Sequence, residues 1–229
     1  MKLYPLEPSS RLITNIARIS KEIKMNVLIL TKGADIPDPD TLVVLSDGLF
    51  DDIASSLIAY YLNGDKIAGI VKSKRTRFGA IDLLPTYLKG AIRKIVFLID
   101  QEDDSLNTIY KNIQRRLEKL ATGEIDIVGE ENEKVKVYKG KYGSREFELT
   151  LIVNGLADIQ TDKHSTEDHF LKAAEMISIE VGEFENSKKA WESITHDERL
   201  KIFKELKANR ELMEGVFPQQ VQGCNYLMK

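Results

Sequence analysis

The sequence has little of several features that mark particular protein classes. A single cysteine, Cys224, stands among 229 residues, which excludes an intramolecular disulfide framework and a cysteine-based zinc site. No apolar run approaches the length of a membrane span. No Gly-x-x-x-x-Gly-Lys-Ser/Thr and no Gly-x-Gly-x-x-Gly motif occurs, so P-loop nucleotide hydrolysis and dinucleotide redox chemistry lose their main sequence support.

The chain also lacks an excess of either charge. It has 33 basic and 36 acidic side chains and a formal net charge of -3, so any basic surface for nucleic acid must be local. Met1 to Ser10 contains Pro5 and Pro8 and lacks the apolar segment of a signal peptide. The low cysteine content fits a reducing compartment. We therefore expect a cytoplasmic protein with no membrane partner.

A short apolar run followed by acids lies near the centre of the sequence. Residues 95–99 are apolar and rich in β-branched side chains, and the run stops at Asp100, Glu102 and Asp104. Apolar residues then recur at helical spacing from Leu106 to Leu120. A buried strand followed by an amphipathic helix is half of a βαβ unit, and parallel sheets bind ligands at the carboxyl ends of their strands. The acids therefore lie where chemistry is expected.

Strands and helices alternate through much of the remaining chain. We predict further strands at residues 27–30, 41–45, 66–71, 125–128, 134–138 and 146–153, and helices at 12–23, 53–62, 81–88 and 166–181, with a final helix beginning at a Thr195/Glu198 capping box. This order predicts an α/β fold, with a Rossmann-like, mainly parallel sheet covered by helices on both faces. A hairpin appended to the sheet is expected after Gly123.

Composition suggests three parts. Residues 1–40 are expected to form an N-terminal helix and strand with a linker, because glycine, prolines and aspartates cluster before position 41. Residues 41–181 form the predicted α/β domain, and residues 182–229 form a C-terminal helical extension. Should that extension present apolar positions that its own domain leaves uncovered, a homodimer is expected.

Two predicted strands end in acids that also open helices, Asp47 and Asp100. If these strands are neighbours, their oxygen ligands converge at one edge, which suits Mg²⁺ or Mn²⁺. Such an ion orients phosphate oxygens and neutralises charge that develops in phosphodiester chemistry. The densest basic run follows the strand at 66–71 and supplies the expected nucleic-acid contacts Lys72, Lys74, Arg75 and Arg77.

These acids resemble the motifs of Toprim domains. Asp47-Gly48-Leu49-Phe50-Asp51 resembles the Glu-Gly-x-x-Asp signature that opens such domains, and Asp100-Gln101-Glu102 resembles their Asp-x-Asp signature. The segment from His164 to Asp168 resembles the Glu-Asp element that closes some small Toprim-like proteins. The resemblance covers residues 42 to 174 and rests on short motifs.

The resemblance implies a Toprim-like fold and metal-dependent chemistry on DNA or RNA, as in a nuclease. It implies that Asp47 transfers protons or binds metal, that Asp51 supports it, and that Asp100, Glu102 and Asp104 hold Mg²⁺ or Mn²⁺. Asp47 replaces the family's usual glutamate and Glu102 its second aspartate. Both replacements keep the negative charge but change the length of the side chain. The resemblance therefore implies metal binding more directly than it implies catalysis.

Other interpretations of the same residues remain open. Asp51 and Asp104 are suited to cap helices, Glu167 and Asp168 to offset a helix dipole, and the basic run to form a solvated loop. A non-catalytic Toprim-like nucleic-acid-binding or assembly module is one alternative function. A second is a NurA-type nuclease with an RNase H-like core, which residues 45–49 and 69–73 resemble. His164 and His169 are spaced i, i+5, which argues against a helical zinc site.

Overall fold

A mainly parallel sheet forms the centre of the computed structural model, which describes residues 1–7, 10–30, 38–46, 48, 50–74, 77–182 and 184–228. Its strands are β1 (Lys2–Pro5), β2 (Thr41–Leu45), β3 (Ile67–Lys72), β4 (Lys94–Asp100), β5 (Asp126–Asn132), β6 (Val135–Tyr142) and β7 (Arg145–Asn154). They lie in the order β1-β3-β2-β4-β7-β6-β5. The first five strands of this order are parallel, whereas β6 runs antiparallel to both β7 and β5. The predicted α/β class is confirmed, including the hairpin after Gly123.

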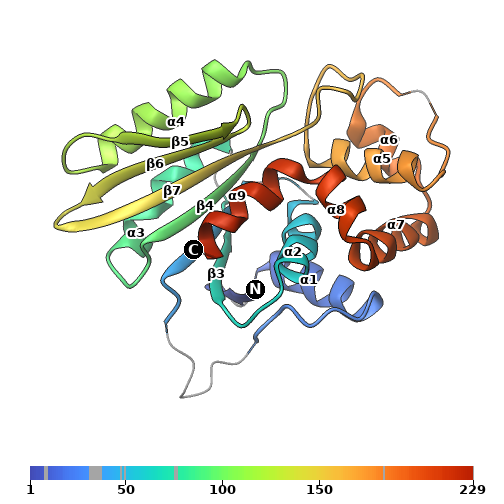
Figure 1. Cartoon of the computed structure of the whole chain (residues 1–229), viewed down its shortest axis with the longest axis horizontal. Coiled ribbons are helices and arrows are strands. Elements are labelled where there is room, and N and C mark those ends of the chain that lie inside the picture. The colour runs from blue at the N-terminus through green and yellow to red at the C-terminus, as the bar shows by residue number, and fades with distance from the viewer. Residues whose placement is uncertain are drawn as a thin grey trace.

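Helices cover both faces of this sheet (Figure 1). They are α1 (Arg11–Glu22), α2 (Asp51–Leu62), the 3-10 helix η1 (Arg77–Leu83), α3 (Leu84–Leu88), α4 (Leu106–Leu120), α5 (Thr166–Met176), α6 (Ser187–Ser193), α7 (His196–Ala208), α8 (Arg210–Val216) and α9 (Pro218–Met228). One core packs η1, α3 and α4 against the sheet, and the other packs the remaining helices against the opposite face. Within the described ranges, no helix has both the length and the apolar character needed to cross a membrane.

The continuous apolar runs of the central strands follow from this two-sided cover. In β2, Leu42 and Val44 belong to the core beneath α3 and α4, whereas Val43 and Leu45 belong to the opposite core. Successive strand residues point to opposite faces. A strand covered on both faces therefore has no position left for a solvent-facing polar residue.

The two segments flanking residues 41–181 build into the same sheet and core. β1, which the sequence analysis does not predict, forms the sheet edge beside β3. The strand predicted at residues 27–30 is reduced to an isolated bridge between Leu3 and Leu28. In the C-terminal segment, Leu206 and Leu212 are buried with the residues of α2 and α5. Most apolar positions of the tail are thus covered by its own chain, whereas Phe184 is 41% exposed.

The helical segment that follows Thr195 begins where the sequence predicts but is not continuous. The capping box at Thr195 and Glu198 is confirmed and begins α7. The chain then breaks at Asn209, whose side chain accepts a hydrogen bond from the backbone N–H of Leu212 at 3.1 Å and caps α8. The Asn209 side chain gives the Leu212 N–H a partner outside a continuous helix, so the predicted final helix is divided into α7 and α8, and a third helix, α9, follows.

A pair of helical glycines tests how tightly α9 packs on the sheet. A Cβ on Gly223 of α9 would lie 2.5 Å from Cδ1 of the buried Ile152, whereas one on Gly215 of α8 would meet only Met176 Cε at 3.8 Å. We expect Gly223→Ala to lower the free energy of unfolding by about 1–3 kcal/mol through overpacking. Gly215→Ala should raise it by about 0.5–1 kcal/mol through helix propensity. Chemical denaturation of both variants gives the comparison, and equal effects would contradict the packing described.

Candidate functional site

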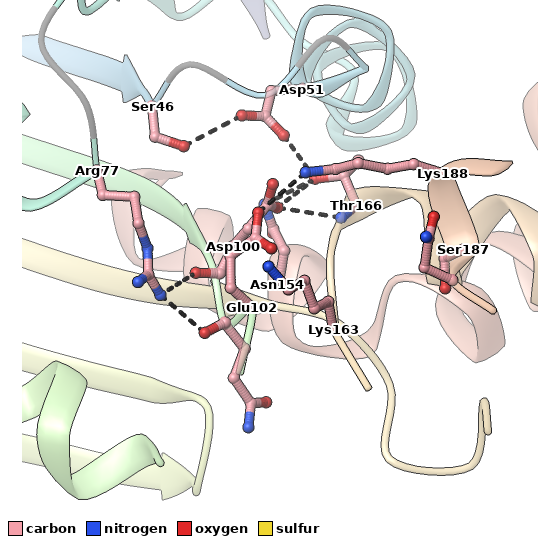
Figure 2. Close-up of polar contacts among 12 residues, drawn as sticks. Ser46, Asp51, Arg77, Asp100, Glu102, Asn154, Lys163, Thr166, Ser187 and Lys188 are labelled. Atoms are coloured by element: carbon pink, nitrogen blue, oxygen red, sulfur yellow. Dashed lines mark hydrogen bonds and ion pairs between the residues drawn. The ribbon is translucent and has the colours of Figure 1, made fainter. Parts of the chain in front are cut away.

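The carboxyl ends of three neighbouring strands meet at one edge of the sheet. β2 and β4 pair in parallel with Leu45 opposite Leu98, and β4 pairs with β7 so that Asp100 lies opposite Asn154. The adjacency expected of the two acid-ending strands is therefore present. Asp47 itself lies outside the described residues, but Asp51 and Asp100 both reach this edge (Figure 2).

Thr166, the first residue of α5, joins these two carboxylates. Its hydroxyl oxygen lies 2.5 Å from Oδ1 of Asp51 and 3.1 Å from Oδ1 of Asp100, and its backbone N–H donates to the same Asp100 oxygen at 3.0 Å. The Nδ2 group of Asn154 donates to the Thr166 hydroxyl at 2.8 Å and to Asp100 Oδ1 at 3.2 Å. Polar groups from β4, β7, α2 and α5 therefore form one connected cluster.

The carboxylates of this cluster are buried and repel one another. Exposure is 0% for Asp51, 5% for Asp100 and 3% for Glu167. Burial, followed by the charge of Asp100, raises the pKa of Asp51 well above its ordinary value and raises the pKa of Glu167. Burial also raises the pKa of Asp100. Carboxyl groups in this situation either retain protons or gain from a nearby cation, and they mark functional sites in many proteins.

A lysine supplies positive charge to this edge. Glu102 accepts an ion-paired hydrogen bond from Lys188 Nζ at 2.9 Å, and Figure 2 shows the Lys188 side chain reaching towards the acidic cluster. The Lys188 charge also acts against the burial of Asp100 and Glu167 by favouring their ionised forms. Part of the predicted cation position is thus taken by an ammonium group.

The donor types suit a hard divalent ion, although their present placement does not complete a site. Carboxylate and amide oxygens are the ligands that Mg²⁺ and Mn²⁺ prefer. In the part of the chain that the structure describes, no three His, Cys, Asp or Glu side chains are placed to hold a metal ion. Glu102 would have to turn away from Lys188 to join Asp100 in binding one.

Gly48 allows the preceding loop to approach Asp51. A Cβ at position 48 would lie 2.6 Å from Asp51 Oδ2, closer than atoms can pack. The hydroxyl of Ser46 lies 3.4 Å from the same oxygen. The glycine of the Asp47-Gly48-x-x-Asp51 motif therefore has a steric reason, because any side chain there would displace the carboxylate.

Asp104 lies apart from the acidic cluster. Its Oδ2 pairs with Arg77 Nη1 at 2.6 Å. The N-cap of α4 is instead Ser105, whose hydroxyl accepts a hydrogen bond from the Thr108 N–H at 3.2 Å. Asp104 thus does not cap the helix, and it is linked to Asp100 through Arg77, which also donates to the Asp100 backbone carbonyl at 3.1 Å. Its expected role as a metal ligand stays a prediction.

Of the predicted phosphate-binding residues, two are paired with groups of the protein and one is exposed. Lys72 donates to Asp52 Oδ1 at 2.7 Å and to the Gly48 carbonyl at 2.6 Å. Besides Asp104, Arg77 donates to the carbonyls of Asp100 and Gln101. Both basic side chains therefore hold the loops of the site together. Lys74 is exposed, and Arg75 lies outside the described residues.

Sequence analysis did not assign four residues of the cluster, namely Asn154, Thr166, Glu167 and Lys188. The Glu-Asp resemblance around residues 164–168 pointed to Glu167, and the end of the strand at residue 153 pointed to Asn154. Nothing near Lys188 in the sequence indicates its contact with Glu102. That ion pair joins residues 86 positions apart.

The arrangement defines an α/β protein with a carboxylate-rich site at the carboxyl edge of its sheet. A comparison of the chain with family models, curated proteins and solved structures finds no match. The function is therefore argued from the geometry and charge of the site itself.

The buried carboxylates predict an unusual pH dependence of stability. Because their pKa values are raised in the folded state, their contribution is fully present below the ordinary values of 3.8 for Asp51 and 4.5 for Glu167 and is lost as the pH rises through the folded values. We expect Asp100→Asn to remove part of this loss and to raise the free energy of unfolding at pH 8 without divalent ions by about 1 kcal/mol. The exposed neighbour Asp103 provides the control variant Asp103→Asn. Thermal unfolding between pH 4 and 9 measures the difference, and identical profiles for the two variants would contradict it.

Proposed function

We propose that this protein is a Toprim-like enzyme that uses Mg²⁺ or Mn²⁺ to cleave phosphodiester bonds of nucleic acid. The observation that carries the proposal is the convergence of Asp51, Asp100 and Glu167, buried carboxylates with raised pKa values, at one sheet edge. Their raised pKa values are a stability cost, which a bound cation would offset. The resemblance to Toprim motifs supplies the nucleic-acid substrate class.

The residues of the edge have distinct expected tasks. Asp100 and Glu102 would bind the ion, joined by Glu167 and, as the resemblance implies, by Asp47. When bound, such an ion orients phosphate oxygens and offsets charge developing at phosphorus. The hydrogen bonds from Thr166 and Asn154 hold one oxygen of Asp100 in place and leave its second oxygen for the ion. This positioning matters because misplaced ligands weaken metal binding.

A non-catalytic binding module is the second candidate, favoured by one specific contact. The ion pair between Lys188 and Glu102 neutralises an expected ligand without a metal. In that case, the aspartate at position 47, which is shorter than the family's usual glutamate, would mark the loss of catalytic activity. Nucleic acid would then bind through exposed lysines such as Lys74. Its affinity would then depend on salt and not on divalent ions.

The strand arrangement bears on the NurA-type alternative. β2 and β3 are parallel and are connected through helix α2. This parallel βαβ connection agrees with the one that the Toprim-like resemblance implies. The NurA-type resemblance is weaker, because the sequence before residue 45 shows no strand that ends in Asp-Gly-Ser.

Cleavage assays test the enzymatic proposal. The protein would be incubated with end-labelled single- and double-stranded DNA and RNA in Mg²⁺, Mn²⁺ or chelator. We expect metal-dependent cleavage that falls at least about a hundredfold in Asp100→Asn and in Asp51→Asn, because each loses a charge at the site. Asp103→Asn should cleave like the unaltered protein. Cleavage that persists in Asp100→Asn or in chelator would remove the proposed mechanism.

Competition between Lys188 and the ion gives a second prediction. Replacing Lys188 by Met removes a positive charge beside the proposed ligands, so Mn²⁺ affinity should rise roughly fivefold in calorimetry. Lys189→Met is the matched control, because Lys189 lies on the same helix and pairs with the exposed Glu185. Equal Mn²⁺ affinities for the two variants would show that Lys188 and the ion do not compete.

A further inference from the structure

Helix α9 brings polar side chains into the core directly behind the acidic cluster. Gln219 and Gln220 in its first turn are 2% and 1% exposed, and the neighbouring Asn154 and His169 are 1% and 0% exposed. Burying amide and imidazole groups costs free energy unless their hydrogen bonds are made. The partners of these groups therefore determine how each side chain is oriented.

Two backbone groups determine the state of His169. Its Nδ1 lies 2.6 Å from the Val216 carbonyl oxygen, which can only accept, so Nδ1 carries a proton. Its Nε2 lies 3.1 Å from the Gly155 backbone nitrogen, which can only donate, so Nε2 accepts. His169 is therefore neutral and presents an acceptor towards α9.

The Nε2 lone pair of His169 is shared by the Gly155 N–H, by Gln219 Nε2 at 3.3 Å and by Gln220 Nε2, which lies nearest. This shared acceptor helps to orient Gln220. The Gln220 Nε2 group lies 2.9 Å from His169 Nε2 and 2.9 Å from Asn154 Oδ1, and an NH₂ group has one proton for each. This orientation leaves Gln220 Oε1 buried without a partner among the described residues. Retaining an unbonded oxygen is unfavourable, so the two donated bonds outweigh it.

Gln220 on one side and Asp100 on the other fix which way the amide of Asn154 faces. Because Asn154 Oδ1 accepts from Gln220, its Nδ2 must face Asp100 Oδ1 at 3.2 Å and the Thr166 hydroxyl at 2.8 Å. The reverse orientation would place an amide oxygen against a carboxylate oxygen. The chain of hydrogen bonds thus runs from the Val216 carbonyl to the acidic cluster.

We propose that Gln220 is a positioning residue of the acidic edge, which acts on Asp100 through the amide of Asn154. The consequence for metal binding rests on the proposed function, whereas the orientation of Asn154 does not. The C-terminal helix α9 is then part of the site, and Gln220 reaches the carboxylates through Asn154. Loss of the Gln220 amide removes the donor that holds Asn154 Oδ1, so that the Asn154 amide is then held from the side of the acidic cluster alone.

Calorimetry with Mn²⁺ and the full chain tests the consequence. We expect Gln220→Met to weaken Mn²⁺ binding about tenfold, the lower range for residues that orient metal ligands. Gln219→Met is the matched control. Gln219 is also buried and its Nε2 lies 3.3 Å from His169 Nε2, but it donates to the Gly155 carbonyl at 3.1 Å instead of to Asn154. In an Asn154→Ala background the Gln220→Met effect should vanish, because the intermediary is already absent. An unchanged affinity in Gln220→Met, or an undiminished effect without Asn154, would overturn the inference.

A measurement without metal separates this inference from the proposed function. The side-chain amide signals of Asn154 in ¹⁵N NMR spectra should shift in Gln220→Met and in Asp100→Asn and stay in place in Gln219→Met. Should no form of the protein bind Mn²⁺, the proposed metal site fails and these signals alone decide the positioning role. Asn154 signals that are unaffected by Gln220→Met would overturn it in either case.

Discussion

The structure depends on keeping several carboxylates together where water is largely excluded. Asp51, Asp100 and Glu167 each lose hydration on folding, and the negative charge of Asp100 raises the pKa values of the other two. The chain balances this cost with hydrogen bonds from Thr166 and Asn154 and with the charge of Lys188. A protein has no structural need for such a cluster, since apolar residues of similar size would pack there at lower cost. The proposed cation would offset this cost.

The parallel sheet is what makes the cluster possible. Adjacent parallel strands end at the same edge, so β2, β4 and β7 deliver their last residues to one place even though the connecting helices are long. The first residues of α2 and α5 then add Asp51 and Thr166 at the same level. These helix starts also place positive backbone dipoles near the carboxylates, which reduces the repulsion among them.

The proposed enzyme and the alternative binding module assign different roles to the ion pair between Lys188 and Glu102. If the pairing of Lys188 with Glu102 is displaced when a divalent ion arrives, the lysine stabilises the protein until the ion binds. If it persists, the lysine neutralises the edge permanently and leaves Asp100 and Glu167 in a non-catalytic site. The partial exposure of the Lys188 side chain, 49%, favours exchange, because an ion pair open to water is weak.

The sequence by itself determined the elements whose signal is local. The apolar run of β4, the capping box of α7 and the acid at the end of β4 were all predicted, because each is specified by residues within a few positions of one another. Gly48 belongs to the motif that resembles Toprim domains, and the structure adds a steric reason for a glycine there. By contrast, β1 is short and has no distinguishing pattern, and it becomes a strand only because β3 offers an edge to pair with.

The partners of the acidic cluster were decided by the tertiary structure alone. Thr166 meets Asp51 across 115 positions, Lys188 meets Glu102 across 86, and Gln220 meets Asn154 across 66. Such contacts depend on how helices pack on the sheet, which no local spacing encodes. The sequence therefore identified where the acids would lie, whereas packing selected the residues that orient and neutralise them.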